Sequence, residues 1–432
     1  MINMSHTPPL SLKEAILINI NVMLGTGIFI NTVLLSKNAG LLSGGLYLFN
    51  GLLVLPLIVS MTALMRIHPR GGFYTFGAQE ISPFAGFLSA WAYFIGKLAS
   101  ATLMVHTALS LIQTIIPALQ GMNTLALDCC VLTLFTGLNL LRMGVGVKLQ
   151  SATFLIKLIP ILFVIGCGFF LFSPAQWVVP HSIMPLIQSM PLVLFTSLGF
   201  EATLSLSNRI ENPQINGPRA IVTAFAVVVS LSCLFQTFFY CMLGTTLAHA
   251  PNYLSAFPAL LTKVLGSAAA AQYASILFHL AITVSALGSA YGILFSTHWN
   301  LHTIAQHGHI FYKKLFTRLN KHAIPTAGIV LQGVICLFYV LITRGNQVPL
   351  QIVASFGCII AYTTSILALL YAHRHIATSV APWVIYLALL NCTFFIASSV
   401  YSLVAVQISS FVLFAVLLLA GICMFVLTRL RA

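Results

Sequence analysis

The chain has 432 residues, of which 59% are hydrophobic and 6% charged, and its formal net charge is +14. This composition excludes a large soluble core and indicates an all-α polytopic membrane protein, with room for about twelve spans of roughly 20–25 residues. The 19 basic residues are scattered between apolar segments, so the charge predicts topology rather than binding to nucleic acid.

We expect a single transmembrane domain over residues 1–432, without a cleavable signal peptide. The expected spans are 12–36, 41–65, 84–116, 124–142, 149–172, 182–207, 219–246, 268–300, 323–342, 348–371, 382–402 and 406–428. With the N-terminus inside, the basic residues in the cytoplasm are Lys13, Arg66, Arg70, Arg142, Lys148, Arg209, Arg219, Lys313, Lys314, Arg318, Lys321, Arg374, Arg429 and Arg431. Those outside are Lys37, Lys263 and Arg344. This bias predicts that both termini are cytoplasmic. The expected lack of a signal peptide and of extracellular domains fits a bacterial inner membrane.

The first span contains two glycines around one hydroxyl, Gly25, Thr26 and Gly27. If the helix breaks there, the free N–H groups of its second half form a site for a carboxylate. Unwound backbone at this depth requires a cavity or surrounding protein. The alternative is a helix-packing face, because small residues let membrane helices approach closely. Spacing alone does not separate these two interpretations.

The loop at residues 66–73 is short, basic and rich in helix breakers, and Glu80 beyond it could pair with Arg66 or Arg70 across a gate. A solvated surface loop is the alternative. Lys97 lies midway along the third span, where a charge usually faces a cavity or a partner. We expect it either to contact an acidic group of the substrate or to neutralise Glu201.

The fifth span holds a second lysine, Lys157, three residues before Pro160, which loosens the helix. A desolvated lysine can exchange a proton within a working range, or it can act as a fixed charge in place of a bound sodium ion. Because Lys157 is near the predicted cytoplasmic third of the span, snorkelling to the interface is the structural alternative.

The sixth span supplies a second expected break around Thr196, Ser197 and Gly199, followed by Glu201 with no cation adjacent in sequence. A lone buried glutamate tends to be protonated, which suits proton sensing or gating. Two interrupted spans five helices apart predict an inverted-repeat transporter with a midplane site. The repeats would cover about 11–172 and 182–371, with two further helices at 382–428.

Three motifs resemble those of the amino acid–polyamine–organocation superfamily of permeases. Residues 25–29 (GTGIF) resemble its G-[ST]-G-[IV]-F motif, residues 69–74 match P-x-G-G-x-Y, and residues 199–201 with 211–221 resemble its G-x-E … N-P motif. The resemblance implies a five-plus-five inverted repeat with broken first and sixth helices. It implies substrate contacts from the amides of Gly25, Thr26 and Gly27, from carbonyls near Met23, Phe195, Thr196 and Leu198, and from Lys97, Phe200 and Tyr362.

By the same resemblance, Lys157 matches a lysine that replaces sodium in some members, which favours proton coupling or ion-independent exchange. Glu201 corresponds to a gating glutamate, and Tyr362 to a tyrosine on the outer side of the pocket. Lys97 stands where arginine exchangers carry a neutral amide, and the end of the eighth span at 296–300 also departs from their pattern. Both departures argue against a cationic substrate.

The remaining segments carry fewer signals. Ser285 and Ser289 could supply oxygens near Lys157, although serines in membrane helices more often bond their own backbone. The histidines of the stretch 298–309 are interpreted as part of a solvated, topology-setting loop without a metal site. These are His298, His302, His307 and His309. The last two spans are expected to serve packing or contact within a homodimer.

The leading hypothesis is a secondary transporter of amino acids or related amines that works by alternating access, coupled to protons or to a counter-substrate. Its expected partners are this small-molecule substrate, protons and the lipid bilayer, with no cofactor and no metal. Sodium-coupled symport is the alternative mechanism. A channel or receptor is less consistent with the sequence, because no repeated filter or continuous polar stripe is visible. An intramembrane enzyme would need converging His, Asp or Glu, and the chain has only 5 acidic residues.

Overall fold

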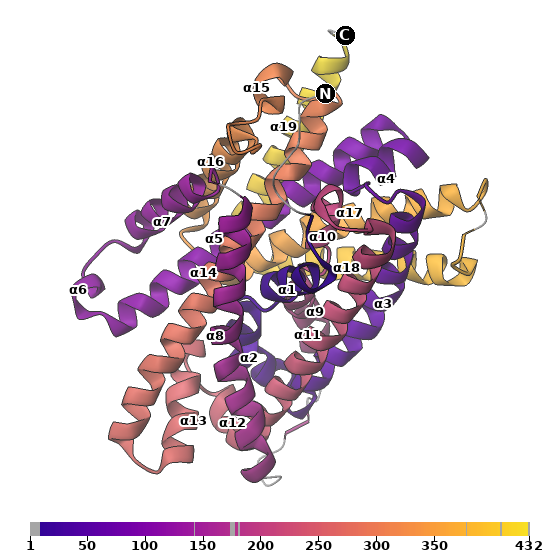
Figure 1. Ribbon diagram of the computed structural model, residues 1–432. Helices are drawn as coiled ribbons and strands as arrows, with labels where there is room; N and C mark the ends of the chain where they lie inside the picture. Colours follow the sequence, from indigo (N-terminus) through magenta and orange to yellow (C-terminus); the bar gives the residue numbers. More distant parts are fainter. Residues whose placement is uncertain are drawn as a thin grey trace.

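The computed structural model describes residues 9–141, 143–172, 178–179, 182–376, 378–406 and 408–430 (Figure 1). Arg142, Arg431 and the side chain of Lys148, which entered the topology prediction, fall outside this description. Within these ranges the chain is helical, and no β-strand is formed.

The helices follow one another along the chain with short connections. They are α1 (Leu12–Met23), α2 (Gly27–Ala39), α3 (Ser43–Ile67), α4 (Phe73–Glu80), α5 (Pro83–Ile115), α6 (Pro117–Gln120), α7 (Thr124–Leu138), α8 (Met143–Phe170), α9 (Met184–Ser197), α10 (Ala202–Ser205), α11 (Pro213–Leu243), α12 (Thr245–Ala248), α13 (Ala256–Leu265), α14 (Ala268–Gln306), α15 (Lys313–Thr317), α16 (Thr326–Thr343), α17 (Gln347–Ala372), α18 (Pro382–Val406) and α19 (Ile408–Leu430). The 3₁₀ turns in the described ranges are η1 (Gly40–Leu42), η3 (Ser207–Arg209) and η4 (Tyr253–Ser255).

Among the described residues, nine helical segments are long and apolar enough to cross a membrane. Shorter apolar helices lie at Thr124–Leu138, Met184–Ser197 and Tyr253–Leu265. The expected all-helical, polytopic architecture is therefore confirmed, and the first and sixth spans are each interrupted. The relation of the two halves as inverted repeats stays a prediction.

The interrupted helices lie inside the bundle. The 33-residue helix α5 packs along α14 and α17, and α1 packs against α8, α11 and α14. The short helix α9 packs against α2 and α17. As a result, the non-helical backbone of both interrupted spans is enclosed by protein, which satisfies the requirement for broken helices at membrane depth.

The bundle has two ends, which we name the α4 face (residues 66–80, 205–211 and 306–317) and the α13 face (residues 245–265 and 343–347). Figure 1 shows α4, α15 and α19 in its upper part and α12 and α13 in its lower part. The Leu10 N–H donates to the Arg209 carbonyl at 2.7 Å, and Phe425 packs on His309 with ring centroids 4.7 Å apart. Both ends of the described chain thus lie at the α4 face, which is the predicted cytoplasmic side.

Candidate functional site

The first break lies between α1 and α2. The Gly25 N–H donates to the Met23 carbonyl at 2.7 Å, which closes a tight turn. Within the described chain, the N–H groups of Thr26, Gly27 and Ile28 have no hydrogen-bond acceptor. The buried Thr26 hydroxyl also has no partner there. These unpaired donors at the positive end of a 13-residue helix are chemically suited to a carboxylate.

The second break lies between α9 and α10, at residues 198–201. Gly199 adopts φ +123°, a conformation that side chains rarely allow. A Cβ at this position would lie 2.7 Å from Val22 Cγ1 and 2.9 Å from the Met23 nitrogen. Glycine is therefore required both by the backbone turn and by the close approach of α1.

The two breaks meet inside the bundle. A Cβ on Gly27 would lie 2.9 Å from Thr196 Oγ1 and 3.0 Å from Phe195 Cδ1, so the start of α2 packs directly on the end of α9. The glycines of the first span thus interrupt the helix and also allow close packing, which unites the two interpretations of the sequence. The structure brings together the predicted substrate residues Met23, Gly25, Thr26, Gly27, Phe195, Thr196, Leu198 and Phe200, all of them buried.

Glu201 lies beside these breaks with a cation next to it, contrary to the expectation of a lone carboxyl. Lys97 Nζ is 3.3 Å from Glu201 Oε1, and both side chains are at most 1% exposed. The Tyr93 hydroxyl donates to the same oxygen at 3.1 Å, and the Gly199 N–H donates to Oε2 at 2.8 Å. Of the two roles expected for Lys97, the structure therefore shows the neutralisation of Glu201.

Aromatic rings cover this cluster on its α4 side. Tyr362 lies 5.4 Å from Phe200 and 6.1 Å from Phe73 between ring centroids, and Phe73 lies 4.5 Å from Tyr93. Phe73 begins α4, so Tyr362 lies toward the α4 face, and its place on the outer side of the pocket stays a prediction. Sequence reasoning missed Tyr93, although its position four residues before Lys97 puts both on one helical face.

Lys157 reaches the carbonyl end of α1. Its Nζ donates to the Asn21 carbonyl at 2.7 Å, to the Leu24 carbonyl at 2.9 Å and to Ser289 Oγ at 3.0 Å. The Ser285 hydroxyl donates to the Leu24 carbonyl at 3.1 Å. The serines thus bond α1 rather than only their own backbone, and Lys157 is fully buried instead of snorkelling. A cation here is stabilised by the negative end of the helix.

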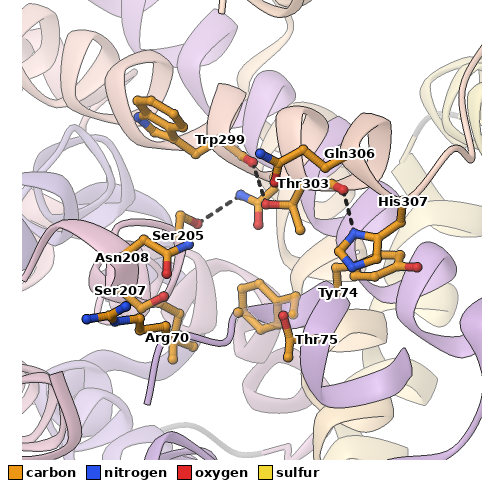
Figure 2. Close-up of a pocket in the computed structure, with 14 residues that line it drawn as sticks. Arg70, Tyr74, Thr75, Ser205, Ser207, Asn208, Trp299, Thr303, Gln306 and His307 are labelled. Carbon is orange, nitrogen blue, oxygen red and sulfur yellow. Dashed lines mark hydrogen bonds between the residues drawn. The ribbon is translucent and has the colours of Figure 1, made fainter. Parts of the chain in front are cut away.

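A polar cavity of ≈ 120 Å³ opens at the α4 face (Figure 2). Among its lining residues are Arg70, Tyr74, Ser205, Asn208, Trp299 and Gln306. Asn300 Nδ2 donates to Ser205 Oγ at 2.8 Å, which ties α14 to α10 across the cavity. Since Phe73 also lines the cavity, the aromatic cover separates this space from the helix breaks.

Two expectations for the α4 face are wrong. Glu80 Oε1 lies 2.5 Å from His68 Nε2, and so its partner is a histidine rather than Arg66 or Arg70. The eighth span continues to Gln306, which buries His298 and His302 within α14 instead of leaving them in a solvated loop. No group of three metal-ligating side chains is found among the described residues.

Comparison with known proteins gives a consistent result. A family model described as amino acid permease matches residues 10–430. A transporter of Mycobacterium bovis and one of Mycobacterium tuberculosis, both described as uncharacterised, are each 26% identical over 257 residues, which cover 57% of this chain and 56% of the relative. The chloroplastic cationic amino acid transporter 9 of Arabidopsis thaliana is 25% identical over 252 residues, covering 51% of this chain and 43% of the relative. The chain thus spans about half the length of these curated relatives.

Proposed function

Because the chain belongs to the amino acid permease family, and is therefore a membrane transporter rather than an enzyme, we propose that it moves amino acids or related amines by alternating access. The observation that supports this most strongly is the meeting of two helix breaks, with the unpaired amides of Thr26, Gly27 and Ile28 at their centre. Such a site would bind the α-carboxylate and α-ammonium groups that all amino acids share.

The substrate carboxylate would accept from these three amides and from the Thr26 hydroxyl. The Gly25 amide, expected from the resemblance, already donates to the Met23 carbonyl and is replaced by the amide of Ile28. At the end of α1, the carbonyls of Asn21 and Leu24 already accept from Lys157. The substrate ammonium would therefore lie at the carbonyl end of α9.

That arrangement pairs each charge of a zwitterion with a helix end of opposite sign. The carbonyls at the end of α9 belong to Phe195, Thr196 and, beyond them, Leu198, and the Phe195 carbonyl already accepts from the Leu198 N–H at 3.1 Å. Phe200 and Tyr362 would form an apolar wall for the substrate side chain. Since the start of α2 packs directly on the end of α9 here, a substrate would bind between them as these two ends separate.

The charge of the cluster favours neutral substrates. Lys97 already neutralises Glu201 at 3.3 Å, which leaves no free carboxylate for the side chain of arginine or lysine. The Arabidopsis relative is named for cationic amino acids, so this chain would differ from it in selectivity. Replacing Lys97 with asparagine should shift preference toward cationic substrates, measured as the ratio of arginine to glutamate uptake. An unchanged ratio would refute this role.

We infer that transport is coupled to protons or to a counter-substrate, with Glu201 as a gating group. The ammonium of Lys157 occupies the position between α1 and α14 that a sodium ion would need, at 2.7–3.0 Å from its oxygen partners. Sodium-coupled symport is the alternative. Uptake into proteoliposomes should survive replacement of sodium and should be lost in Lys157→Ala that remains folded. Strict dependence on sodium would contradict the proposal.

The orientation that we propose for the chain in the membrane follows from the distribution of its basic residues. We place both termini in the cytoplasm of a bacterial cell, with the α4 face inward. Large apolar side chains of α18 and α19 are exposed, among them Trp383, Val404 and Leu419. These surfaces would contact lipid or a second copy in a homodimer.

A further inference from the structure

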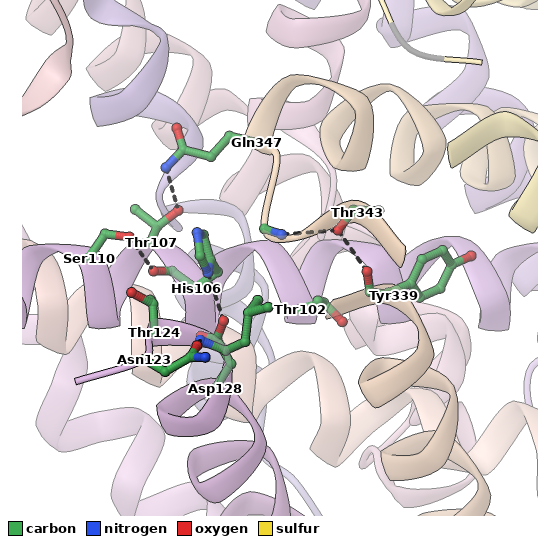
Figure 3. Close-up of polar contacts among 12 residues, drawn as sticks. Thr102, His106, Thr107, Ser110, Asn123, Thr124, Asp128, Tyr339, Thr343 and Gln347 are labelled. Carbon is green, nitrogen blue, oxygen red and sulfur yellow. Dashed lines mark hydrogen bonds and ion pairs between the residues drawn. The ribbon is translucent and has the colours of Figure 1, made fainter. Parts of the chain in front are cut away.

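A second buried acid–base pair lies away from the helix breaks, between α5 and α7 (Figure 3). Asp128 is fully buried, and its Oδ2 lies 2.7 Å from His106 Nδ1. Its Oδ1 has no hydrogen-bond partner among the described residues. The His106 side chain is 15% exposed, which leaves a path by which a proton can reach the pair. Neither residue is used by the proposed substrate site.

The charge balance of the pair depends on a single proton. With one proton shared, the two groups together are neutral, either as imidazolium with carboxylate or as imidazole with carboxylic acid. When that proton leaves, a carboxylate without a cation is left in a fully buried position, which is costly unless water enters. Loss of the proton therefore requires hydration of the region.

The surrounding elements do not supply a substitute charge at Asp128. The titratable and charged groups that the described parts of these elements carry in this half of the bundle are Cys129, Cys130, Tyr253, Tyr273, His279, Tyr291, Cys336, Tyr339 and Arg344. Among these, none is a carboxylate, and the one permanently charged side chain, Arg344, is exposed. Asp128 is moreover the only aspartate in the whole chain. The Asp128 carboxylate can thus be neutralised only within this pair, by a proton on His106 or on Asp128 itself.

The pair lies directly beneath segments of the α13 face. The His106 ring occupies the space where a Cβ on Gly345 would be, and Gly345 has φ +74° in the turn between α16 and α17. On the next residue of α5, Thr107 accepts from Gln347 Nε2 at 3.4 Å. Gln347 also donates to the Tyr253 hydroxyl of η4 at 3.1 Å. Movement of this turn away from α5 would admit more water to the pair and let it reach the buried Asp128.

We propose that His106 and Asp128 together bind one exchangeable proton from the α13 face, and that the bound proton favours the closed form of that face. This inference rests on the proposed transport function and adds to it a proton site separate from Lys157. A ligand that binds one of two conformations shifts the population toward it, and here the ligand is the proton. Acidification on the α13 side would therefore promote closure and uptake.

Isotope-edited infrared spectroscopy tests the site without any substitution. Because Asp128 is the only aspartate, ¹³C-labelled aspartate in the purified full-length chain reports on this one carboxyl group. Its bands should differ between samples held at about pH 8 and at about pH 5.5. The change should be lost in His106→Gln, which keeps an amide donor near Asp128. Constant bands in the wild type, or the same change in His106→Gln, would overturn the proposal.

Uptake into proteoliposomes tests the consequence, at fixed pH on the α4 side and varied pH on the α13 side. Wild-type uptake should rise on acidification, by at most about tenfold per pH unit for one proton. Asp128→Asn should flatten this profile, whereas Glu80→Gln, at the His68–Glu80 pair of the α4 face, should retain it. A retained profile in Asp128→Asn would count against the linkage. If the wild type transports no amino acid, the infrared result still decides the proton site, and so the two failures are distinguishable.

Discussion

Removal of the Lys97 ammonium should destabilise the protein far more than removal of an exposed lysine. At the observed 3.3 Å, two unit charges attract by about 5 kcal/mol at an effective dielectric constant of about 20. Breaking a buried pair from one side typically costs roughly 3–5 kcal/mol, because the other charge stays buried. In Lys97→Met, the donors that Glu201 retains among the described residues are the Tyr93 hydroxyl and the Gly199 N–H, with the Tyr362 hydroxyl nearby.

A double-mutant cycle measures this coupling. The free energy of unfolding in detergent should fall by about 3–5 kcal/mol in Lys97→Met and should recover largely in the double variant with Glu201→Gln. The exposed Lys13→Met is the matched control, with an expected change within about 0.5 kcal/mol. If Lys97→Met is no more destabilising than Lys13→Met, the ion pair does not stabilise the site and the assignment of Lys97 is wrong.

Three further predictions concern other parts of the site. Gly199→Ala should abolish substrate binding in a calorimetric titration, since its Cβ would clash with the end of α1. The control Gly266→Ala, at a glycine with φ +64° and no neighbouring atoms, should retain binding. Equal effects of the two substitutions on binding would contradict this argument. Lys157→Ala should lower the melting temperature, because the carbonyls at the end of α1 lose a buried cation; an unchanged value would argue against this contact. Burial and neighbouring cations lower the pKa of His309, whose Nε2 is 2.8 Å from the Tyr74 hydroxyl. The folded state therefore binds a proton at His309 less readily than the unfolded state does. As a result, acidification below about pH 6.5 should destabilise the wild type. His309→Gln should lose less stability on acidification, and equal loss would refute this role.

The interruptions of the first and sixth spans were predictable because Gly25, Gly27 and Gly199 stand beside hydroxyl residues inside apolar segments. Which amides remain unpaired was not predictable, since it depends on a hydrogen bond from the Gly25 N–H to the Met23 carbonyl. The sequence offered Ser285 and Ser289 as oxygens near Lys157 but favoured bonds to their own backbone, whereas in the structure Ser289 accepts from Lys157.

Contacts between segments that are far apart in the sequence could not be predicted. Lys97 and Glu201 are on different helices, and hydropathy does not reveal that they form a pair. His298 was assigned to a loop together with the basic stretch that follows it, yet α14 continues to Gln306 and buries it. The prediction that Glu80 pairs with Arg66 or Arg70 was wrong for a related reason. Either arginine has the opposite charge, but charge alone does not reveal which side chain lies next to Glu80 in the fold.

The most direct test of the central claim is competition for uptake of a neutral amino acid into sodium-free proteoliposomes by matched pairs of ligands. Each pair consists of an amino acid and the amine that lacks its carboxylate. If the carboxylate binds the amides of Thr26, Gly27 and Ile28, the amino acid should compete and the amine should not. Equal competition by both, or a strict requirement for sodium, would contradict the account.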